Sequence, residues 1–258
     1  MKKIILPLLS FVFVISLLLT NISAAENSYS WYCKRNKEHK QPTVDSNMSF
    51  IDGYDVYYVD KNHSEKNQEK VIYLTFDAGY ENGNIEKILD VLKEENVKAA
   101  FFILENLLDK NPELVCRMAQ EGHLVCNHTS NHPDITKIGG ADALRRELST
   151  LEERYSEVTG KEMSKYFRPP EGKFNRTSVE LLQSWGYKTI LWSFAYADWD
   201  NNSQMSEEKA KAKIYENLHN GEIMLLHPTS ATNAKIMKDV ISYLKDQGYS
   251  FGTLDDLK

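Results

Sequence analysis

The chain has few cysteines, and their number and spacing exclude two kinds of small, cross-linked fold. Among 258 residues there are three, Cys33, Cys116 and Cys126. An odd and sparse set does not describe a disulfide framework, and no Cys-x-x-Cys spacing is present for a zinc site. One pair is able to bridge, but we expect buried free thiols.

An excess of positive charge is also missing. The formal net charge is −6, and it becomes −8 when residues 1–25, whose only charges are Lys2 and Lys3, are set aside. Nucleic-acid-binding proteins normally carry a basic stripe, so this balance argues against a nucleic-acid partner. Gly79 and Gly83 match no phosphate-binding loop. No feature indicates a stable protein partner.

Hydrophobic runs long enough to span a bilayer are absent. The longest, from Ile4 to Leu19, follows two lysines and ends near the small residues Ser23, Ala24 and Ala25. Residues 1–25 are predicted to be a secretory signal, because they begin with basic residues, continue with a short apolar run and end with small residues suited to a cleavage site. An uncleaved membrane anchor is the alternative. Either reading places the protein outside the cytoplasm, secreted or in the cell envelope.

The remainder divides into two parts. Residues 26–65 are polar and show no sustained period, which indicates an irregular extension that lays a few aromatics on the main domain, or else a disordered tether. Residues 66–258 form one domain in which apolar runs alternate with amphipathic stretches. Strands are predicted near 71–76, 98–104, 123–127, 166–168, 187–192, 222–227 and 249–252.

Helices are expected between these strands. They lie near 84–95, from Pro112, at 141–158 and at 177–185, the last beginning with a Thr177–Glu180 capping pair. The same order of helix, glycine and strand recurs at Gly122, Gly186, Gly221 and Gly248. Strict alternation favours an α/β fold with a parallel sheet, open or closed into a barrel.

Chemically capable side chains follow five of the predicted strands. These residues are Asp77, His128, Arg168, Asp198 and His227. The carboxyl ends of parallel strands meet at one rim, so the five side chains are expected to converge there. Singly, each has an ordinary interpretation: Asp77 as the cap of a turn, the histidines as core residues, Asp198 as a loop residue.

Two smaller patterns refine this site. His128 and His132 are four residues apart and able to face one metal ion, although a pair with this spacing is more often structural. Arg168 precedes two prolines that fix the backbone, and a guanidinium next to a carboxylate keeps that carboxylate ionised. A carboxylate bonded to an imidazole, as in an Asp198–His227 pair, favours the protonated imidazole that a general acid requires.

The sequence resembles the polysaccharide deacetylases, the carbohydrate esterase group with the NodB-homology domain. Five short motifs match in order: Thr75 to Gly79, His128 to His132, Arg168 to Gly172, Asp198-Trp199 and Leu225 to His227. The resemblance covers about residues 66–258. It implies a distorted (β/α)7-type barrel of parallel strands. The string from Thr75 to Gly83 is most similar to the subgroup that deacetylates N-acetylmuramic acid in spore-cortex peptidoglycan before muramic δ-lactam forms.

The resemblance also implies roles. Asp77 becomes the catalytic base, held ionised by Arg168, and His227 the acid, oriented by Asp198, while His128 and His132 hold a divalent metal such as Zn, Mg or Mn. The family has a second aspartate, a metal ligand, where this chain has Ala78, so we expect weak metal binding. Tyr80, Tyr196 and Trp199 are candidates for binding the peptidoglycan glycan strand; Trp192 is another, although core packing suits it better.

The activity implied is hydrolysis of an acetamido group on peptidoglycan, with release of acetate. Two alternatives stay open at this point. One is an enzyme of the same family acting on N-acetylglucosamine polymers or on acetyl esters of xylan. The other is a protein that binds glycans without catalysis.

Overall fold

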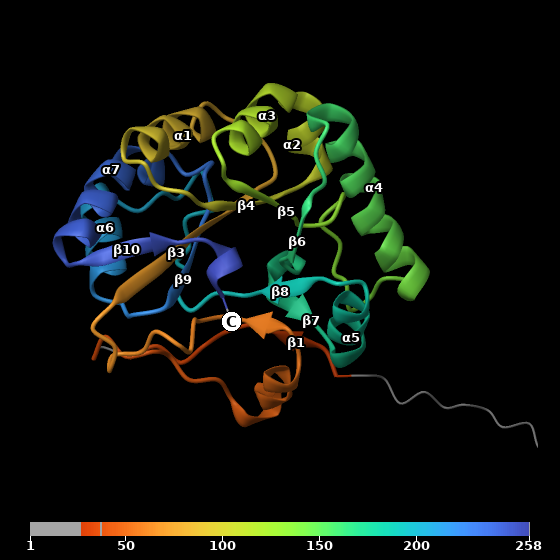
Figure 1. Cartoon of the computed structure of the whole chain (residues 1–258), viewed down its shortest axis with the longest axis horizontal. Helices are drawn as coiled ribbons and strands as arrows, with labels where there is room; N and C mark the ends of the chain where they lie inside the picture. Colours follow the sequence, from red (N-terminus) through yellow and green to blue (C-terminus); the bar gives the residue numbers. More distant parts are fainter. Residues whose placement is uncertain (1–26, 37, 258) are drawn as a thin grey trace, which may run out of the picture.

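The fold is organised around one curled, parallel sheet. The computed structural model describes residues 27–36 and 38–257, so the predicted signal segment lies outside the described residues. Within these ranges the order of strands is β10, β3, β4, β5, β6, β8 and β2, with β9 on the other side of β3, and every pair is parallel (Figure 1). The predicted α/β class with a barrel-like parallel sheet is confirmed.

Seven of these strands coincide with the seven predicted from the sequence. They are β3 (Lys70–Ala78), β4 (Ala100–Ile103), β5 (Leu124–Asn127), β6 (Ser164–Phe167), β8 (Lys188–Ile190), β9 (Glu222–Leu226) and β10 (Tyr249–Gly252). The remaining strand, β2 (Val56–Tyr57), was not predicted, because it lies in the extension that the sequence analysis treats as irregular.

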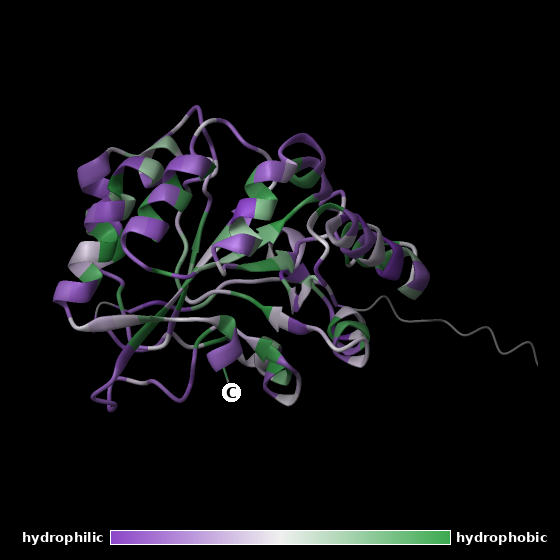
Figure 2. Cartoon of the chain, turned by 45° about the horizontal axis from the view of Figure 1, so that its top comes forward, coloured by the Kyte–Doolittle hydropathy of each residue, from purple (hydrophilic) through white to green (hydrophobic). Residues whose placement is uncertain are grey.

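Helices cover the outside of the sheet (Figure 1). They are α1 (Ile85–Glu94), α2 (Glu105–Lys110), α3 (Pro112–Gln120), α4 (Ala141–Thr159), α5 (Arg176–Ser184), α6 (Glu207–Tyr215) and α7 (Ala231–Asp246). Figure 2 shows their polar residues on the outward faces and the apolar strands in the middle. Such one-sided helices are stable because their apolar stripe is buried against the sheet.

The predicted cap of α5 is wrong. Asn175 is the N-cap, and its side-chain oxygen accepts a hydrogen bond from the Ser178 backbone N–H at 2.8 Å, while the Ser178 hydroxyl oxygen accepts one from the Asn175 N–H. Glu180 instead accepts a hydrogen bond from the Tyr54 hydroxyl in the extension. A contact with the extension therefore holds the Glu180 side chain, which the local sequence pattern had assigned to the helix cap.

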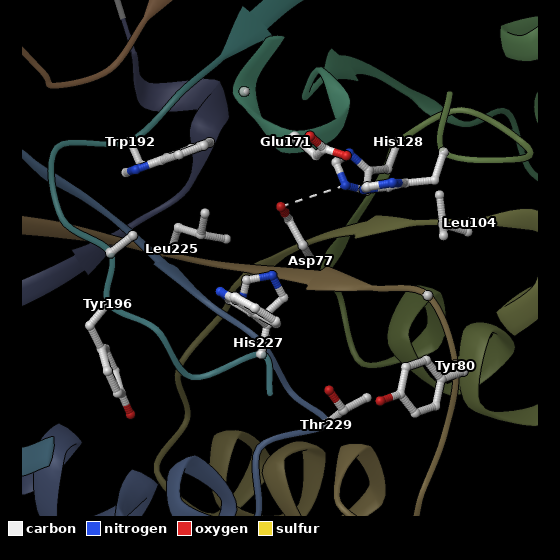
Figure 3. Close-up of a pocket in the computed structure, with 15 residues that line it drawn as sticks. Asp77, Tyr80, Leu104, His128, Glu171, Trp192, Tyr196, Leu225, His227 and Thr229 are labelled. Carbon is white, nitrogen blue, oxygen red and sulfur yellow. Dashed lines mark ion pairs between the residues drawn. The ribbon is translucent and has the colours of Figure 1, made fainter. Parts of the chain in front are cut away.

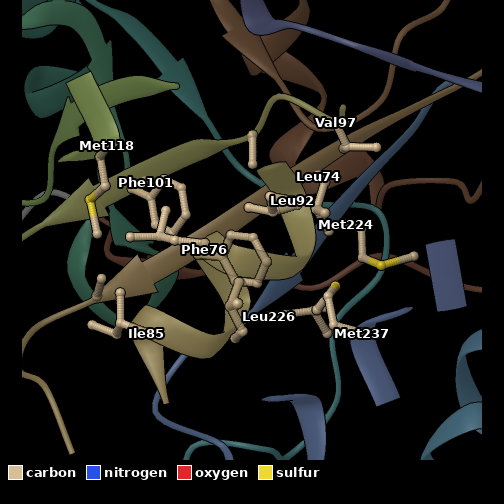
Figure 4. Close-up of a cluster of buried hydrophobic side chains, with 14 of the residues drawn as sticks. Leu74, Phe76, Ile85, Leu92, Val97, Phe101, Met118, Met224, Leu226 and Met237 are labelled. Atoms are coloured by element: carbon tan, nitrogen blue, oxygen red, sulfur yellow. The ribbon is translucent and has the colours of Figure 1, made fainter. Parts of the chain in front are cut away.

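Strand β3 shows why the sequence run is apolar on both faces. Ile72, Leu74 and Phe76 point to the helix side and belong to the main hydrophobic core (Figure 4), whereas Val71 and Tyr73 point to the concave side. Both faces of such a parallel strand are buried, so apolar residues occupy successive positions and the sequence is a continuous apolar run. The same alternation puts Asp77 on the concave side, at the carboxyl end of the strand.

The extension is more ordered than predicted. It contains β1 (Tyr29–Ser30), the 3-10 helix η1 (Ser46–Gly53) and β2, which pairs in parallel with β8. β1 pairs antiparallel with β7 (Lys173–Phe174), directly after the Arg168–Gly172 motif. The aromatics Trp31, Tyr58 and Phe174 are buried between extension and domain. The expectation that the extension lays aromatics on the main domain is therefore confirmed.

The three cysteines are unpaired in the structure. Cys126 is buried, and Cys33 and Cys116 are half-buried, so the prediction of free thiols is confirmed while complete burial holds for Cys126 alone. Of the helices that the structure describes, none has the length and apolar content needed to cross a membrane.

Gly221 offers a test of how tightly the extension is fitted. Its φ is +75°, and an added Cβ would lie 2.4 Å from the Asp60 carbonyl oxygen. Gly160 has a similar φ of +68° with no atom within 4 Å of an added Cβ. Gly160→Ala should therefore cost only the left-handed strain, about 1–2 kcal/mol, and Gly221→Ala should cost a further ~1–3 kcal/mol for the clash.

Urea unfolding of both variants measures this difference. Equal losses of unfolding free energy would show that the extension adjusts without cost and that its fit against β9 is loose.

Candidate active site

A pocket opens at the carboxyl ends of the strands, where the predicted residues converge. Its volume is about 800 Å³. Seven of the nine residues predicted from the sequence line it, namely Asp77, Tyr80, His128, His132, Tyr196, Trp199 and His227. The other two, Arg168 and Asp198, are buried and each bonds to one of the seven. Figure 3 shows Asp77 with His128 on one side and His227 on the other.

The buried guanidinium of Arg168 holds Asp77 in place. Arg168 Nη1 donates to Asp77 Oδ1 at 2.7 Å, and the arginine side chain has no exposed surface. Its Nη2 donates to the Thr75 hydroxyl oxygen at 2.9 Å, and the guanidinium lies over the Phe102 ring at 4.2 Å. Because it is held on several sides, the guanidinium can face the carboxylate in only one orientation.

The environment of Asp77 keeps it ionised. Burial by itself raises the pKa of this carboxyl, but the positive charge of Arg168 and the two nearby imidazoles outweigh burial, and the net effect lowers the pKa below its usual value. Asp77 is therefore a carboxylate at neutral pH, one oxygen of which is bonded to Arg168.

A second carboxylate orients His227. Asp198 Oδ1 accepts a hydrogen bond from His227 Nδ1 at 2.7 Å, and Asp198 Oδ2 accepts one from the His227 backbone N–H at 2.8 Å. Burial lowers the pKa of His227, but the hydrogen bond and charge of Asp198, helped by Asp77, outweigh it and raise the pKa above the usual value. The contact with Asp198 thus favours the protonated ring, in which Nε2 is the remaining donor.

His128 and His132 come together as predicted. Their ring centroids are 5.0 Å apart and the rings are nearly perpendicular. His128 Nδ1 donates to the Arg168 carbonyl oxygen at 2.7 Å, so its Nε2 carries the lone pair, 3.6 Å from Asp77 Oδ2. Burial lowers the pKa of His128 to about 4, although the Asp77 carboxylate opposes this shift. A neutral imidazole is the form that binds metals.

The groups that face one another beside Asp77 are suited to a divalent ion. The His128 lone pair and an Asp77 oxygen are two acceptors that face each other, an arrangement that a cation stabilises. No group of three His, Cys, Asp or Glu side chains with metal-site spacing occurs within the described ranges. Ala78 has no exposed surface and packs in the main core. The residues present fit an ion with two imidazole ligands.

The aromatic residues predicted to bind the glycan differ in their exposure and in their hydrogen bonds. Trp199 and Tyr80 are 61% and 45% exposed at the pocket mouth, and Tyr80 accepts a hydrogen bond from Asn201 Nδ2 at 2.6 Å. The hydroxyl of Tyr196 points away from Asp77 and donates to Asn233 (Figure 3). Trp192, for which core packing was the better expectation, is half-buried and lines the pocket.

Asn233 and Glu171 are among the site residues that the sequence analysis missed. Asn233 Nδ2 donates to Asp198 Oδ2 at 2.6 Å, but it lies in the first turn of α7, where no local signal connects it to the site. Glu171 lines the pocket with φ 55° and ψ 13°, the left-handed conformation. Its place between two prolines and a glycine indicates a turn but not where the side chain points.

A carboxylate with a lowered pKa and an imidazole with a raised pKa face one pocket on a curled parallel sheet, an arrangement suited to hydrolysis by acid–base chemistry. A model of the polysaccharide deacetylase family matches residues 64–190. The peptidoglycan-N-acetylmuramic acid deacetylase PdaA of Bacillus subtilis is 39% identical over 229 residues, 88% of this chain and 85% of that protein. The chain belongs to the polysaccharide deacetylase family, whose members include hydrolases of amide bonds.

Solved structures and a further relative agree with this assignment. The structure of Bacillus subtilis PdaA, a family 4 carbohydrate esterase, has a TM-score of 0.83 and 39% identity, covering 89% of this chain and 96% of that one. The peptidoglycan-N-acetylglucosamine deacetylase PgdA of Listeria monocytogenes is 35% identical over 192 residues, 73% of this chain but 39% of that protein.

Replacing the orienting carboxylate tests the charge state of His227. In Asp198→Asn the charge that raises the pKa of His227 is lost, so the imidazole should titrate at lower pH than in the wild type. NMR titration of the ring, assigned with a His227→Gln variant, measures the midpoint. A midpoint that does not fall would show that Asp198 is not the source of the raised pKa.

Proposed function

We propose that this chain hydrolyses the acetamido group of N-acetylmuramic acid residues in peptidoglycan, releasing acetate and leaving a free amine. The observation that carries the proposal is the arrangement of two residues in one pocket: Asp77, which is hydrogen-bonded to Arg168, and His227, which is hydrogen-bonded to Asp198. Similarity to PdaA over most of both chains supports muramic acid as the sugar and the route to muramic δ-lactam in spore cortex as the context.

Each residue has one task in this mechanism. Asp77 takes a proton from water as the water oxygen bonds to the acetyl carbonyl carbon. When the carbon–nitrogen bond breaks, His227 Nε2 gives its proton to the nitrogen, which is otherwise a poor leaving group. The products are acetate and an amine, and proton exchange with solvent restores both residues. Tyr80 and Trp199 are the side chains at the mouth that contact the sugar rings.

His128 and His132 would hold the divalent ion that such deacetylases use. A bound ion supplies a positive charge that stabilises the oxygen of the attacked carbonyl. With two imidazoles as the protein's own ligands, water or substrate oxygens complete the shell, so we expect weak binding. The reaction takes place outside the cytoplasm, in the cell wall, where the signal-like segment 1–25 would direct the chain.

Acetate release decides the function. The assay uses peptide-stripped peptidoglycan strands and chitin oligomers, each with chelator and with added Zn, Mg or Mn. Release from the muramic substrate alone supports the proposal, and release from chitin alone moves the activity to the N-acetylglucosamine type of the Listeria relative. Binding to wall material with no acetate under any ion would leave a non-catalytic glycan-binding protein.

Asp77→Asn should lower kcat by at least ~10²-fold, because general base catalysis typically contributes that much. The chain should still fold, because the amide oxygen of the new side chain can accept a hydrogen bond from Arg168, but with a lower free energy of unfolding, since the buried guanidinium loses its counter-charge. Asp109→Asn is the matched control, at an exposed ion pair with Arg154. Undiminished acetate release by Asp77→Asn would remove this residue from the mechanism.

The pH dependence follows from the two shifted groups. Activity should rise as Asp77 loses its proton, at a pH below that of an ordinary Asp because its pKa is lowered, and fall as His227 loses its proton, above the ordinary range because its pKa is raised. A bell-shaped profile of kcat/KM is expected, with a plateau that extends from below the ordinary Asp pKa to above the ordinary His pKa. An alkaline limb below the ordinary His range would contradict the role of His227 as acid.

A further inference from the structure

The segment Ile190–Asp198 connects strand β8 to the carboxylate that orients His227. It contributes Trp192, Ala195 and Tyr196 to the pocket and ends at Asp198. After Ile190 it forms no further strand, although the Leu191 N–H donates to the Tyr57 oxygen of β2, and the Ser193 and Phe194 N–H groups donate to the Ile223 oxygen of β9. Backbone carbonyls in such a buried, irregular stretch need donors from elsewhere in the protein. Where those donors lie shows what fixes the segment.

Three of its carbonyls are satisfied from within the catalytic domain. Arg168 Nε donates to the Ile190 oxygen at 3.0 Å, and Arg168 Nη2 donates to the Leu191 oxygen at 3.3 Å. The Leu225 backbone N–H donates to the Phe194 oxygen at 2.9 Å. The two bonds from Arg168 connect the start of the segment to the same arginine that holds Asp77.

The carbonyls of residues 192, 193 and 195 receive their donors from the N-terminal extension. The donors are Trp31 Nε1 at 2.8 Å, Cys33 Sγ at 3.3 Å and Arg35 Nη1 at 3.1 Å, respectively. Trp31, Cys33 and Arg35 are alternate residues, which an extended chain presents on one side. Every carbonyl from residue 190 to residue 195 thus has a side-chain or backbone donor from another part of the fold.

The surroundings of the three donors suit this role. Trp31 is 6% exposed, and its backbone N–H also donates to the Gly172 oxygen at 2.8 Å, next to the Arg168 motif. Burial raises the pKa of the Cys33 thiol to about 12, so it remains a donor at neutral pH. The Arg35 guanidinium lies 5.4 Å from the centre of the Phe194 ring, within the segment itself.

We propose that Trp31, Cys33 and Arg35 form a clamp that fixes the segment Ile190–Asp198 and so positions Asp198, and through it His227, for proton donation. The inference rests on the function proposed above and adds three positioning residues to it. The extension then contributes to the geometry of the active site, although Trp31, Cys33 and Arg35 lie outside the residues matched by the family model.

The test removes the donors one by one in the full chain. Trp31→Phe keeps a ring but loses the indole N–H, Cys33→Ala loses the thiol, and Arg35→Leu loses the guanidinium while keeping much of the stem. Tyr32→Ala is the matched control, because Tyr32 lies between the donors and is 50% exposed. A combined variant carries all three donor changes.

The readouts are the NMR titration of the His227 ring and a separation of kcat from KM. Groups with charge that act on His227 are Asp198 from the segment, Asp77 from β3 and Arg168 after β6; the Asn233 amide from α7 contacts Asp198. A displaced Asp198 weakens the largest favourable contact, so the His227 midpoint should fall toward its value in Asp198→Asn. The titration needs no turnover, so it tests the clamp even if no acetate is released.

We expect Trp31→Phe and Arg35→Leu each to lower kcat about threefold to tenfold, the effect of one ordinary hydrogen bond, with KM little changed. The combined variant should lose more, and Tyr32→Ala should match the wild type. A lower melting temperature with an unchanged His227 midpoint and unchanged kcat would overturn the proposal and leave the extension a stabilising role only. Should the combined variant fail to fold, Arg35→Leu decides, since that residue is exposed.

Discussion

The contact on which the site depends is the ion pair between the buried guanidinium of Arg168 and Asp77. A charge without exposed surface is costly unless it is paired and its remaining donors are used, and here they reach Thr75, Ile190 and Leu191. The Arg168 side chain therefore connects the carboxyl ends of β6, β3 and β8. Because the pair lowers the pKa of Asp77, the stability it contributes is present above the ordinary Asp pKa and is lost as the pH falls toward the lowered value.

The two carboxylates of the site serve opposite purposes because their partners differ. Asp77 faces a permanent cation and is left with one oxygen toward the pocket, which suits a base. Asp198 is 2% exposed and is bonded to an imidazole, a backbone N–H and an amide, which leaves it no free oxygen and makes it a support for His227. The roles proposed for Asp77 as base and for Asp198 as support of His227 thus follow from the groups that surround each carboxylate.

The N-terminal extension has no periodic sequence pattern, yet it is ordered by its contacts with the main domain. Residues 27–60 form no long element, yet β2 pairs with β8, β1 pairs with β7, and Trp31 packs against Gly172 while donating to the Trp192 oxygen. An added Cβ at Gly172 would lie 2.7 Å from the Trp192 ring, so the motif loop and the segment Ile190–Asp198 are packed as one unit with the extension. Short strands of this kind have no sequence signal, because their order comes from partners distant in the chain.

The sequence alone determined the seven main strands, the parallel arrangement and which residues meet at the rim, because buried strands, helix-ending glycines and strand-end polar residues are local signals. What tertiary structure decided are the positions set by distant segments: Asn233 on Asp198, Glu171 in the pocket wall, Trp192 lining the pocket, and Glu180 bonded to Tyr54 rather than placed in a helix cap. The physical reason is the same in each case. A polar group or aromatic ring adopts the position in which its hydrogen bonds are satisfied in the packed fold. Its partner can be far away in the chain, more than a hundred residues for Trp31, so spacing in the sequence does not identify it.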